Sequence, residues 1–216
     1  MALLNQPLQL VVLLFALSIL PLFVVLGTSF LKLTIVFSLL RNALGTQQIP
    51  PNIALYGLAL ILTLFIMAPI GLEIHDNLAK HPVELEADDF TGQAESSVLT
   101  PYRAFLQRNT TPEQVRFFAE TGHKLWPQSY RTRIADQSLL VLMPAFTVSQ
   151  MTEAFKIGLL LYLPFVAIDL VVSNVLLAMG MMMVSPMTIS LPLKLLVFVL
   201  MNGWEKLLGQ LLMSFS

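Results

Sequence analysis

Two long runs without a charged residue constrain this chain more than any other feature. They cover residues 8–27 and 53–72, and each is about 20 residues long, enough for a helix to cross the hydrocarbon core of a bilayer. The composition agrees, because 56% of the 216 residues are hydrophobic and only 12% are charged, whereas a soluble domain carries about 25% charged residues. The sequence therefore predicts an all-α, integral membrane protein built from helical hairpins.

Polarity divides the chain into three predicted parts. Residues 1–72 form a first hydrophobic helical hairpin, residues 73–137 a small polar helical domain, and residues 138–216 a second helical hairpin. Lys32 and Arg41 lie near the connection of the first hairpin, and basic residues favour the cytoplasmic side of a membrane. We therefore expect the polar domain on the opposite, periplasmic side. The N-terminus lacks the charge pattern of a signal peptide and is expected to stay in the mature protein.

Several helix boundaries can be predicted from local signals. Pro21 interrupts the first apolar run and predicts a kink or an earlier helix end. Gly45 follows the next apolar run closely enough to end its helix, and Asn52 is placed to begin the following one. In the polar domain, Thr100 and Thr111 each precede a proline, which is typical of a helix N-terminus. We expect short helices over residues 102–107 and from Thr111 to about residue 122.

The polar domain also holds most of the acidic residues of the chain. They include Glu84, Glu86, Asp88, Asp89 and Glu95. The Asp88-Asp89 pair is interpreted as a solvated loop. The three histidines, His75, His81 and His123, are too scattered in sequence to indicate a metal site.

Charged residues interrupt the apolar segments of the second hairpin. Glu153 and Lys156 share a helix face. Asp169 lies within the run 157–177, and Lys194 lies at the start of the run 191–213. Charge at this depth normally faces protein or a watery cavity. These segments are therefore expected to be buried in an assembly.

The partners of these charges remain open from sequence alone. Asp169 and Lys194 lie on opposite arms of the hairpin at unequal distances from its tip, so they pair either within one chain or between neighbouring copies. Lys32, inside the apolar start of the second helix, either extends its ammonium to the membrane interface or is neutralised by a carboxylate inside an assembly. Removing one partner of a buried pair costs about 3–5 kcal/mol.

A methionine-rich loop, residues 179–192, forms the predicted tip of the second hairpin. Its five methionines are Met179, Met181, Met182, Met183 and Met187. Gly180, Pro186 and Pro192 predict a bent connection, because a helix does not run cleanly through two prolines. Methionine is deformable and fills irregular gaps, so these side chains either line a closable passage or fill an ordinary core or lipid-facing position.

Several functional classes are excluded or disfavoured. The chain has no cysteine, no phosphate-binding glycine loop, no GxSxG elbow and no metal-ligand pair at helical spacing. Asp169 lacks the second intramembrane aspartate that an aspartyl hydrolase needs. The net charge is -1, which does not indicate nucleic-acid binding. We expect neither enzymatic activity nor a cofactor.

Three long segments carry a specific resemblance. Residues 30–36, 39–52 and 178–194 resemble the export-gate protein of bacterial type III secretion systems, the SctR/FliP family (YscR, HrcR and SpaP in individual systems). The resemblance extends over nearly the whole chain outside the polar domain. The short N-terminus is more similar to the injectisome branch, which serves virulence, than to the flagellar branch.

The resemblance implies a structural, non-enzymatic role. In this family, about five copies assemble into a helical pore with SctS-like and SctT-like proteins and other export-apparatus components. That pore lies at the bacterial inner membrane, projects into the periplasm within the basal body, and admits unfolded secreted proteins. The methionine loop would form the gasket that seals the closed channel. The alternative is a small-solute transporter or ion channel that uses Asp169 and Lys194, for which an inverted repeat would be expected.

Overall fold

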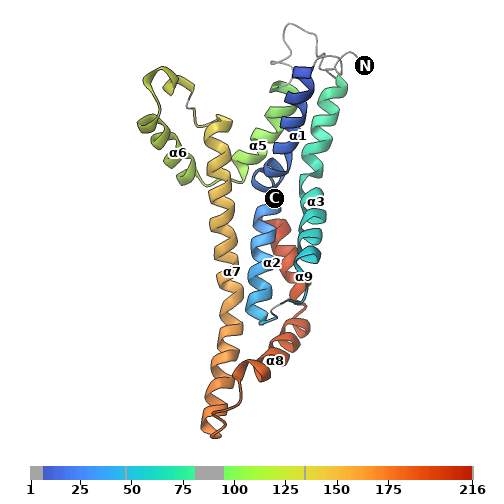
Figure 1. Ribbon diagram of the computed structural model, residues 1–216, viewed down its shortest axis with the longest axis vertical. Helices are drawn as coiled ribbons and strands as arrows, with labels where there is room; N and C mark the ends of the chain where they lie inside the picture. The colour runs from blue at the N-terminus through green and yellow to red at the C-terminus, as the bar shows by residue number, and fades with distance from the viewer. Residues whose placement is uncertain (1–6, 47, 81–94, 134, 216) are drawn as a thin grey trace. The chain divides into compact units, whose positions relative to one another are not determined.

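The structure is a computed structural model that describes residues 7–46, 48–80, 95–133 and 135–215 (Figure 1). Within these residues every regular element is helical, so the predicted all-α class is confirmed. Two helices, α3 (Asn52–Lys80) and α7 (Leu139–Ala178), are long and apolar enough to cross a membrane. Up to four spans result if each of two bent helix pairs counts as one. Glu84, Glu86, Asp88 and Asp89, together with His81, lie outside the described residues.

The chain divides into two compact units. The first comprises Met1–Leu31 and Met67–Ser149, and the second comprises Lys32–Ile66 and Gln150–Ser216. Helices α3 and α7 each contribute to both units. The three-part division by polarity concerns topology across a membrane and stays a prediction.

The boundaries of the first three helices follow local signals closely. Helix α1 (Pro7–Gly27) continues through Pro21, so an earlier end at this proline was wrong. Helix α2 (Phe30–Leu44) ends where Gly45 adopts a left-handed conformation with φ of 79°, as predicted. Helix α3 begins at Asn52, also as predicted, but runs through Pro69 to Lys80.

The two short helices predicted in the first unit are both present, but they begin in different ways. The π-helix η2 (Glu95–Leu99) leads directly into α5 (Thr100–Arg108), so Thr100 lies inside a continuous helical segment. Thr111 does occupy the N-cap position of α6 (Pro112–Leu125), but its hydroxyl lies 3.1 Å from Ser149 Oγ on α7 and makes no cap bond. A tertiary hydrogen bond has replaced the local one. A 3₁₀ turn, η3 (Gln128–Arg133), follows α6.

The hydrophobic core of the first unit packs α5 and α6 against the start of α7. Ala119 and Val141 are buried together, and Val115, Phe118 and Trp126 pack against them. The Phe105 ring of α5 contacts the Phe146 ring of α7 in a tilted arrangement, with 5.6 Å between ring centroids. These contacts hold the polar helices against the beginning of a membrane-length helix.

The second unit contains the long arm of α7, followed by α8 (Pro186–Leu200) and α9 (Gly203–Met213). The predicted bend over residues 179–192 is shorter than expected, because α8 begins at Pro186 and contains Pro192. Proline is well suited to the first helical position, where its missing N–H has no partner to lose. The predicted run 191–213 is broken instead at Asn202, which has φ of 52°, and α8 and α9 meet at 63°.

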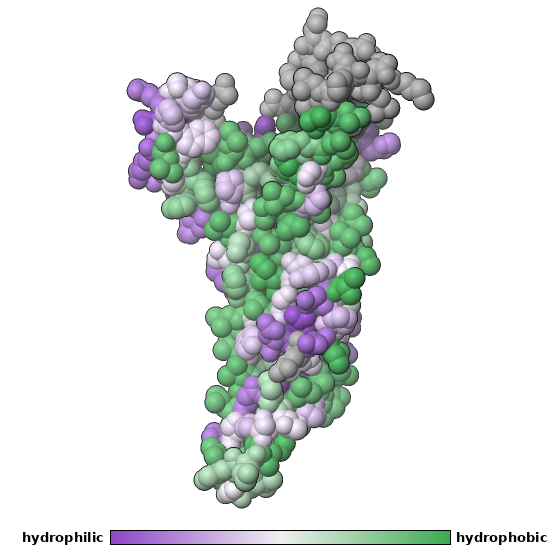
Figure 2. All heavy atoms as spheres, viewed as in Figure 1, coloured by the Kyte–Doolittle hydropathy of each residue, from purple (hydrophilic) through white to green (hydrophobic). Residues whose placement is uncertain are grey.

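Close packing defines the core of this unit. Leu33, Val36, Phe37 and Leu40 of α2 are buried, and the Phe37 ring meets Trp204 of α9 at 6.3 Å. A Cβ atom on Gly158 would lie 2.1 Å from Leu39 Cδ1, so a larger residue here would have to displace the Leu39 side chain where α2 approaches α7. By contrast, Figure 2 shows apolar residues over much of the visible helix surface, and the exposed side of α7 includes Phe155, Leu159, Leu163, Leu170 and Val171.

Candidate functional site

The methionine loop begins with a glycine-dependent helix end. Gly180 has φ of 73°, its N–H donates to Leu177 O at 3.0 Å, and the Met181 N–H donates to Leu176 O at 2.9 Å. This pair of bonds is a Schellman motif, which satisfies the last carbonyls of α7 and reverses the chain. Ser185 then adopts an extended conformation ahead of Pro186, where α8 starts. The local sequence thus fixes a tight bend of residues 179–185.

The side chains of this bend are uncovered. Met183 is 101% exposed and Met182 81% exposed, and the three other loop methionines, Met179, Met181 and Met187, are exposed as well. A core position is therefore ruled out for these five methionines within a single copy of the chain. Flexible apolar side chains gathered at an uncharged tip form a surface that a second macromolecule or lipid must cover.

Asp169 and Lys194 form an ion pair within one chain. Lys194 Nζ lies 2.6 Å from Asp169 Oδ2 and also donates to Ala43 O, at the end of α2, at 3.2 Å. From the sequence, Asp169 and Lys194 were expected at unequal distances from the hairpin tip, because the bend was predicted to extend over residues 179–192. With the observed helix ends, Asp169 lies nine residues before Ala178 and Lys194 lies eight residues after Pro186, so the two positions are level.

Lys32 and Glu153 form a second ion pair. Lys32 Nζ lies 2.5 Å from Glu153 Oε2, and its side chain is 0% exposed. Lys32 therefore does not extend to an interface, and its neutralising carboxylate comes from the same chain. The ring of Phe215 lies 4.3 Å from this ammonium, a contact that sequence reasoning missed because no local pattern links residues so far apart. Lys156 is exposed on α7 and is not part of this pair.

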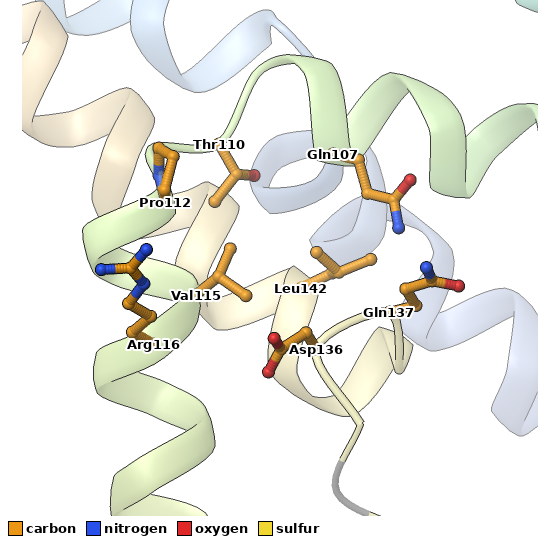
Figure 3. A pocket seen from close by; sticks show the side chains of 8 residues that line it. All are labelled: Gln107, Thr110, Pro112, Val115, Arg116, Asp136, Gln137 and Leu142. Atoms are coloured by element: carbon orange, nitrogen blue, oxygen red, sulfur yellow. The ribbon is translucent and has the colours of Figure 1, made fainter.

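The first unit contains a mixed polar cavity of about 310 Å³ (Figure 3). In Figure 3, Arg116 on α6 lies at the left and Asp136, on the segment before α7, lies at the lower centre, while Val115 and Leu142 lie toward the middle. Gln107, Thr110, Pro112 and Gln137 complete the lining. Thr110 already donates its hydroxyl proton to Leu106 O at 2.6 Å. The described residues contain no group of three His, Cys, Asp or Glu side chains that could hold a metal ion.

A family model described as "FliP family" matches residues 13–211. The chain belongs to the FliP family. The match includes both ion pairs, the whole methionine bend and the polar cavity, and it ends before Phe215. It confirms the resemblance drawn from the three long sequence segments.

Several relatives match this FliP-family chain over nearly its whole length. It is 58% identical over 217 residues to "Virulence protein YscR" of Salmonella typhimurium, covering 100% of both chains. It is 52% identical to "Yop proteins translocation protein R" of Yersinia pestis, covering 99% of this chain and 98% of that one. It is 43% identical to "Harpin secretion protein HrcR" of Erwinia amylovora, covering 97% of each.

Proposed function

We propose that this protein is a structural subunit of the export gate of a type III secretion system, with no catalytic role. The observation that carries the proposal is the uncovered methionine bend at the end of a 40-residue apolar helix. The full-length similarity to YscR- and HrcR-type proteins, whose names refer to virulence, translocation and secretion, supports it.

In the proposed assembly, about five copies surround a shared axis, as closed cyclic oligomers do. The methionine bends meet at that axis and close the channel. An unfolded passenger presents many kinds of side chain, so its gate must exclude water and ions without gripping any one of them. Thioether side chains re-pack easily around different surfaces, and an apolar constriction blocks ions by dewetting.

The two ion pairs fit an assembly role. Each pair buries a lysine almost completely and leaves its carboxylate partly exposed on α7. Each therefore fixes α7 to another helix of the same chain before any partner arrives. The exposed apolar side of α7 is then available to other copies, to SctS-like and SctT-like proteins and to further export-apparatus components. We place this assembly in the bacterial inner membrane, projecting into the periplasm.

No observation favours the transporter or channel alternative. The Lys194 ammonium is occupied by Asp169 and by Ala43 O, which suits a structural clamp. The connection between α2 and α3 contains Gly45, Pro50 and Pro51, whereas the one between α7 and α8 is rich in methionine. This difference weighs against an inverted repeat.

The test is a conductance measurement on the assembled gate. We expect the triple substitution Met181→Ala, Met182→Ala and Met183→Ala to raise ion leakage across the membrane, because the seal loses its deformable apolar volume. Met201→Ala with Met213→Ala is the matched control, since both residues are exposed methionines outside the bend. Unchanged leakage through triple-variant complexes of normal mass on native gels would refute the proposal.

A further inference from the structure

We propose that each subunit carries a receptor groove, beside its own methionine bend, that holds the methionine bend of the neighbouring copy. This inference rests on the proposed function, because it requires several copies around one axis. Beyond the proposed function, it assigns the surface of each subunit that the neighbouring methionine bend contacts.

The groove lies within the second unit, between residues 45–46 and 48–49 after α2 and the first three turns of α8. Its volume is about 860 Å³. One wall holds Gly45, Thr46, Gln48 and Ile49, and the other holds Ser185, Met187, Thr188, Leu191, Pro192 and Leu195. The walls come close at Gly45, where a Cβ atom would lie 3.8 Å from Met187 Cε.

The lining of this groove is incomplete in a single copy. Ile49 is 76% exposed, and Met187 and Leu195 are exposed too. None of the ten lining residues is charged. An apolar partner therefore gains by covering the groove, whereas a charged segment would lose its hydration there without finding a counter-ion.

The methionine bend has the matching chemistry. Residues 179–185 contain no charged side chain, so the bend enters a neutral groove without burying an unpaired charge. Met182 and Met183 are uncovered in their own chain. Their unbranched side chains adapt to an irregular lining, and the hydroxyls of Ser185 and Thr188 provide donors for the backbone carbonyls of an incoming bend.

The arrangement of both surfaces on one chain gives the contact its direction. The groove wall starts at Ser185, where the bend ends, so each copy presents an insert and a receptor side by side. Two different patches of one chain make a heterologous contact, which produces a ring when the rotation closes. Repeated around the axis, this contact joins every bend to the next subunit and leaves no gap in the seal between copies.

The chain has no cysteine, so introduced cysteines report this contact directly. One tagged copy carries Met183→Cys and a differently tagged copy carries Ile49→Cys, and the two are co-expressed with the export-apparatus partners. Mild oxidation of the purified complex is expected to give a disulfide-linked dimer that contains both tags, because a disulfide forms only when the two Cα atoms come within about 7 Å. A second pair, Met182→Cys with Leu195→Cys, is expected to crosslink as well.

The matched control pairs Met183→Cys with Leu125→Cys, an exposed apolar position of the first unit, and should not crosslink. Oligomers of normal mass in which neither test pair crosslinks would overturn the groove assignment while leaving the export-gate proposal intact. If native mass spectrometry of such oligomers shows retained phospholipid, the groove is a lipid site instead. A protein that stays monomeric with its partners present would overturn both proposals.

Discussion

Asp169 and Lys194 are separated by 25 residues in sequence and by 2.6 Å between their charged atoms, but they are not equally buried. The Lys194 side chain is 5% exposed and the Asp169 side chain 42% exposed. The pair therefore closes the helical hairpin that carries the methionine bend, and the consequences of breaking it depend on which partner is lost.

We expect Asp169→Asn to destabilise the protein more than Lys194→Met does. The first variant leaves a buried ammonium with neutral oxygens as its acceptors, Ala43 O among them, and no opposite charge, which costs about 3–5 kcal/mol. The second leaves a carboxylate that is already partly exposed, so its cost is smaller. Thermal unfolding in detergent, together with native gels of the assembled complex, measures the difference.

The double variant provides the control for this comparison. Asp169→Asn combined with Lys194→Met removes both charges, so it should recover much of the stability lost in Asp169→Asn. Equal unfolding temperatures for the two single variants would show that the unequal burial of the pair has no energetic consequence.

Phe215 supports the other buried ammonium. Its ring lies 4.3 Å from Lys32 Nζ and is itself buried. A cation–π contact in a desolvated site contributes about 2 kcal/mol, so Phe215→Leu, which keeps most of the apolar volume, should lower the free energy of unfolding by about that amount. The loss should shrink in a Lys32→Met background, where no ammonium remains, and a double-mutant cycle measures this coupling. If Phe215→Leu lowers the free energy of unfolding equally in both backgrounds, Phe215 stabilises the protein through packing alone.

The helix ends that were predicted correctly are those decided by backbone chemistry. Gly45 ends α2 in a left-handed conformation, and Gly180 similarly ends α7. Neither outcome depends on distant parts of the chain. Asn202 is the exception, because Asn-Gly is a recognised turn signal, yet the apolar residues on both sides of it favoured one continuous helix.

The errors have a common physical cause in tertiary contacts. The Thr111 hydroxyl forms a hydrogen bond with the Ser149 hydroxyl and makes no side-chain bond to the start of its own helix, and no local pattern reveals that tertiary contact. Pro192 lies inside α8, and this one misplaced boundary put Asp169 and Lys194 at unequal heights. For the candidate site, the methionines and the charged residues could be named from sequence, whereas the partner of Lys32 and the groove beside the bend required the fold.

A third prediction concerns Gly27 at the end of α1. A Cβ atom at this position would lie 2.3 Å from Tyr102 Oη and 3.3 Å from Met143 Cε. Gly27→Ala should therefore destabilise the protein by about 1–3 kcal/mol, the usual cost of overpacking. In a Tyr102→Phe background the obstructing oxygen is absent, and the added methyl group should cost clearly less. Chemical unfolding of the four proteins of this cycle tests the explanation, which fails if the alanine costs the same in both backgrounds.

The last prediction concerns the alkaline stability of the first unit. Tyr102 donates its hydroxyl proton to Gly27 O at 2.9 Å, and burial raises its pKa to about 12 from an ordinary value of 10.0. Below pH 10 the phenol is neutral in both folded and unfolded chains, so this residue adds no pH dependence. Between pH 10 and pH 12 the unfolded chain releases the proton more readily than the folded chain, and stability falls as the pH rises.

Tyr102→Phe should change this behaviour in two ways. At neutral pH it should cost about 1 kcal/mol through the lost hydrogen bond, and above pH 10 its further loss of stability should be smaller than that of the unmodified protein. Tyr130→Phe is the matched control, because Tyr130 is exposed and its replacement leaves Tyr102 in place. Unfolding temperatures in detergent from pH 7 to pH 11.5 provide the measurement. Parallel alkaline profiles for Tyr102→Phe and the unmodified protein would show that another group controls the transition.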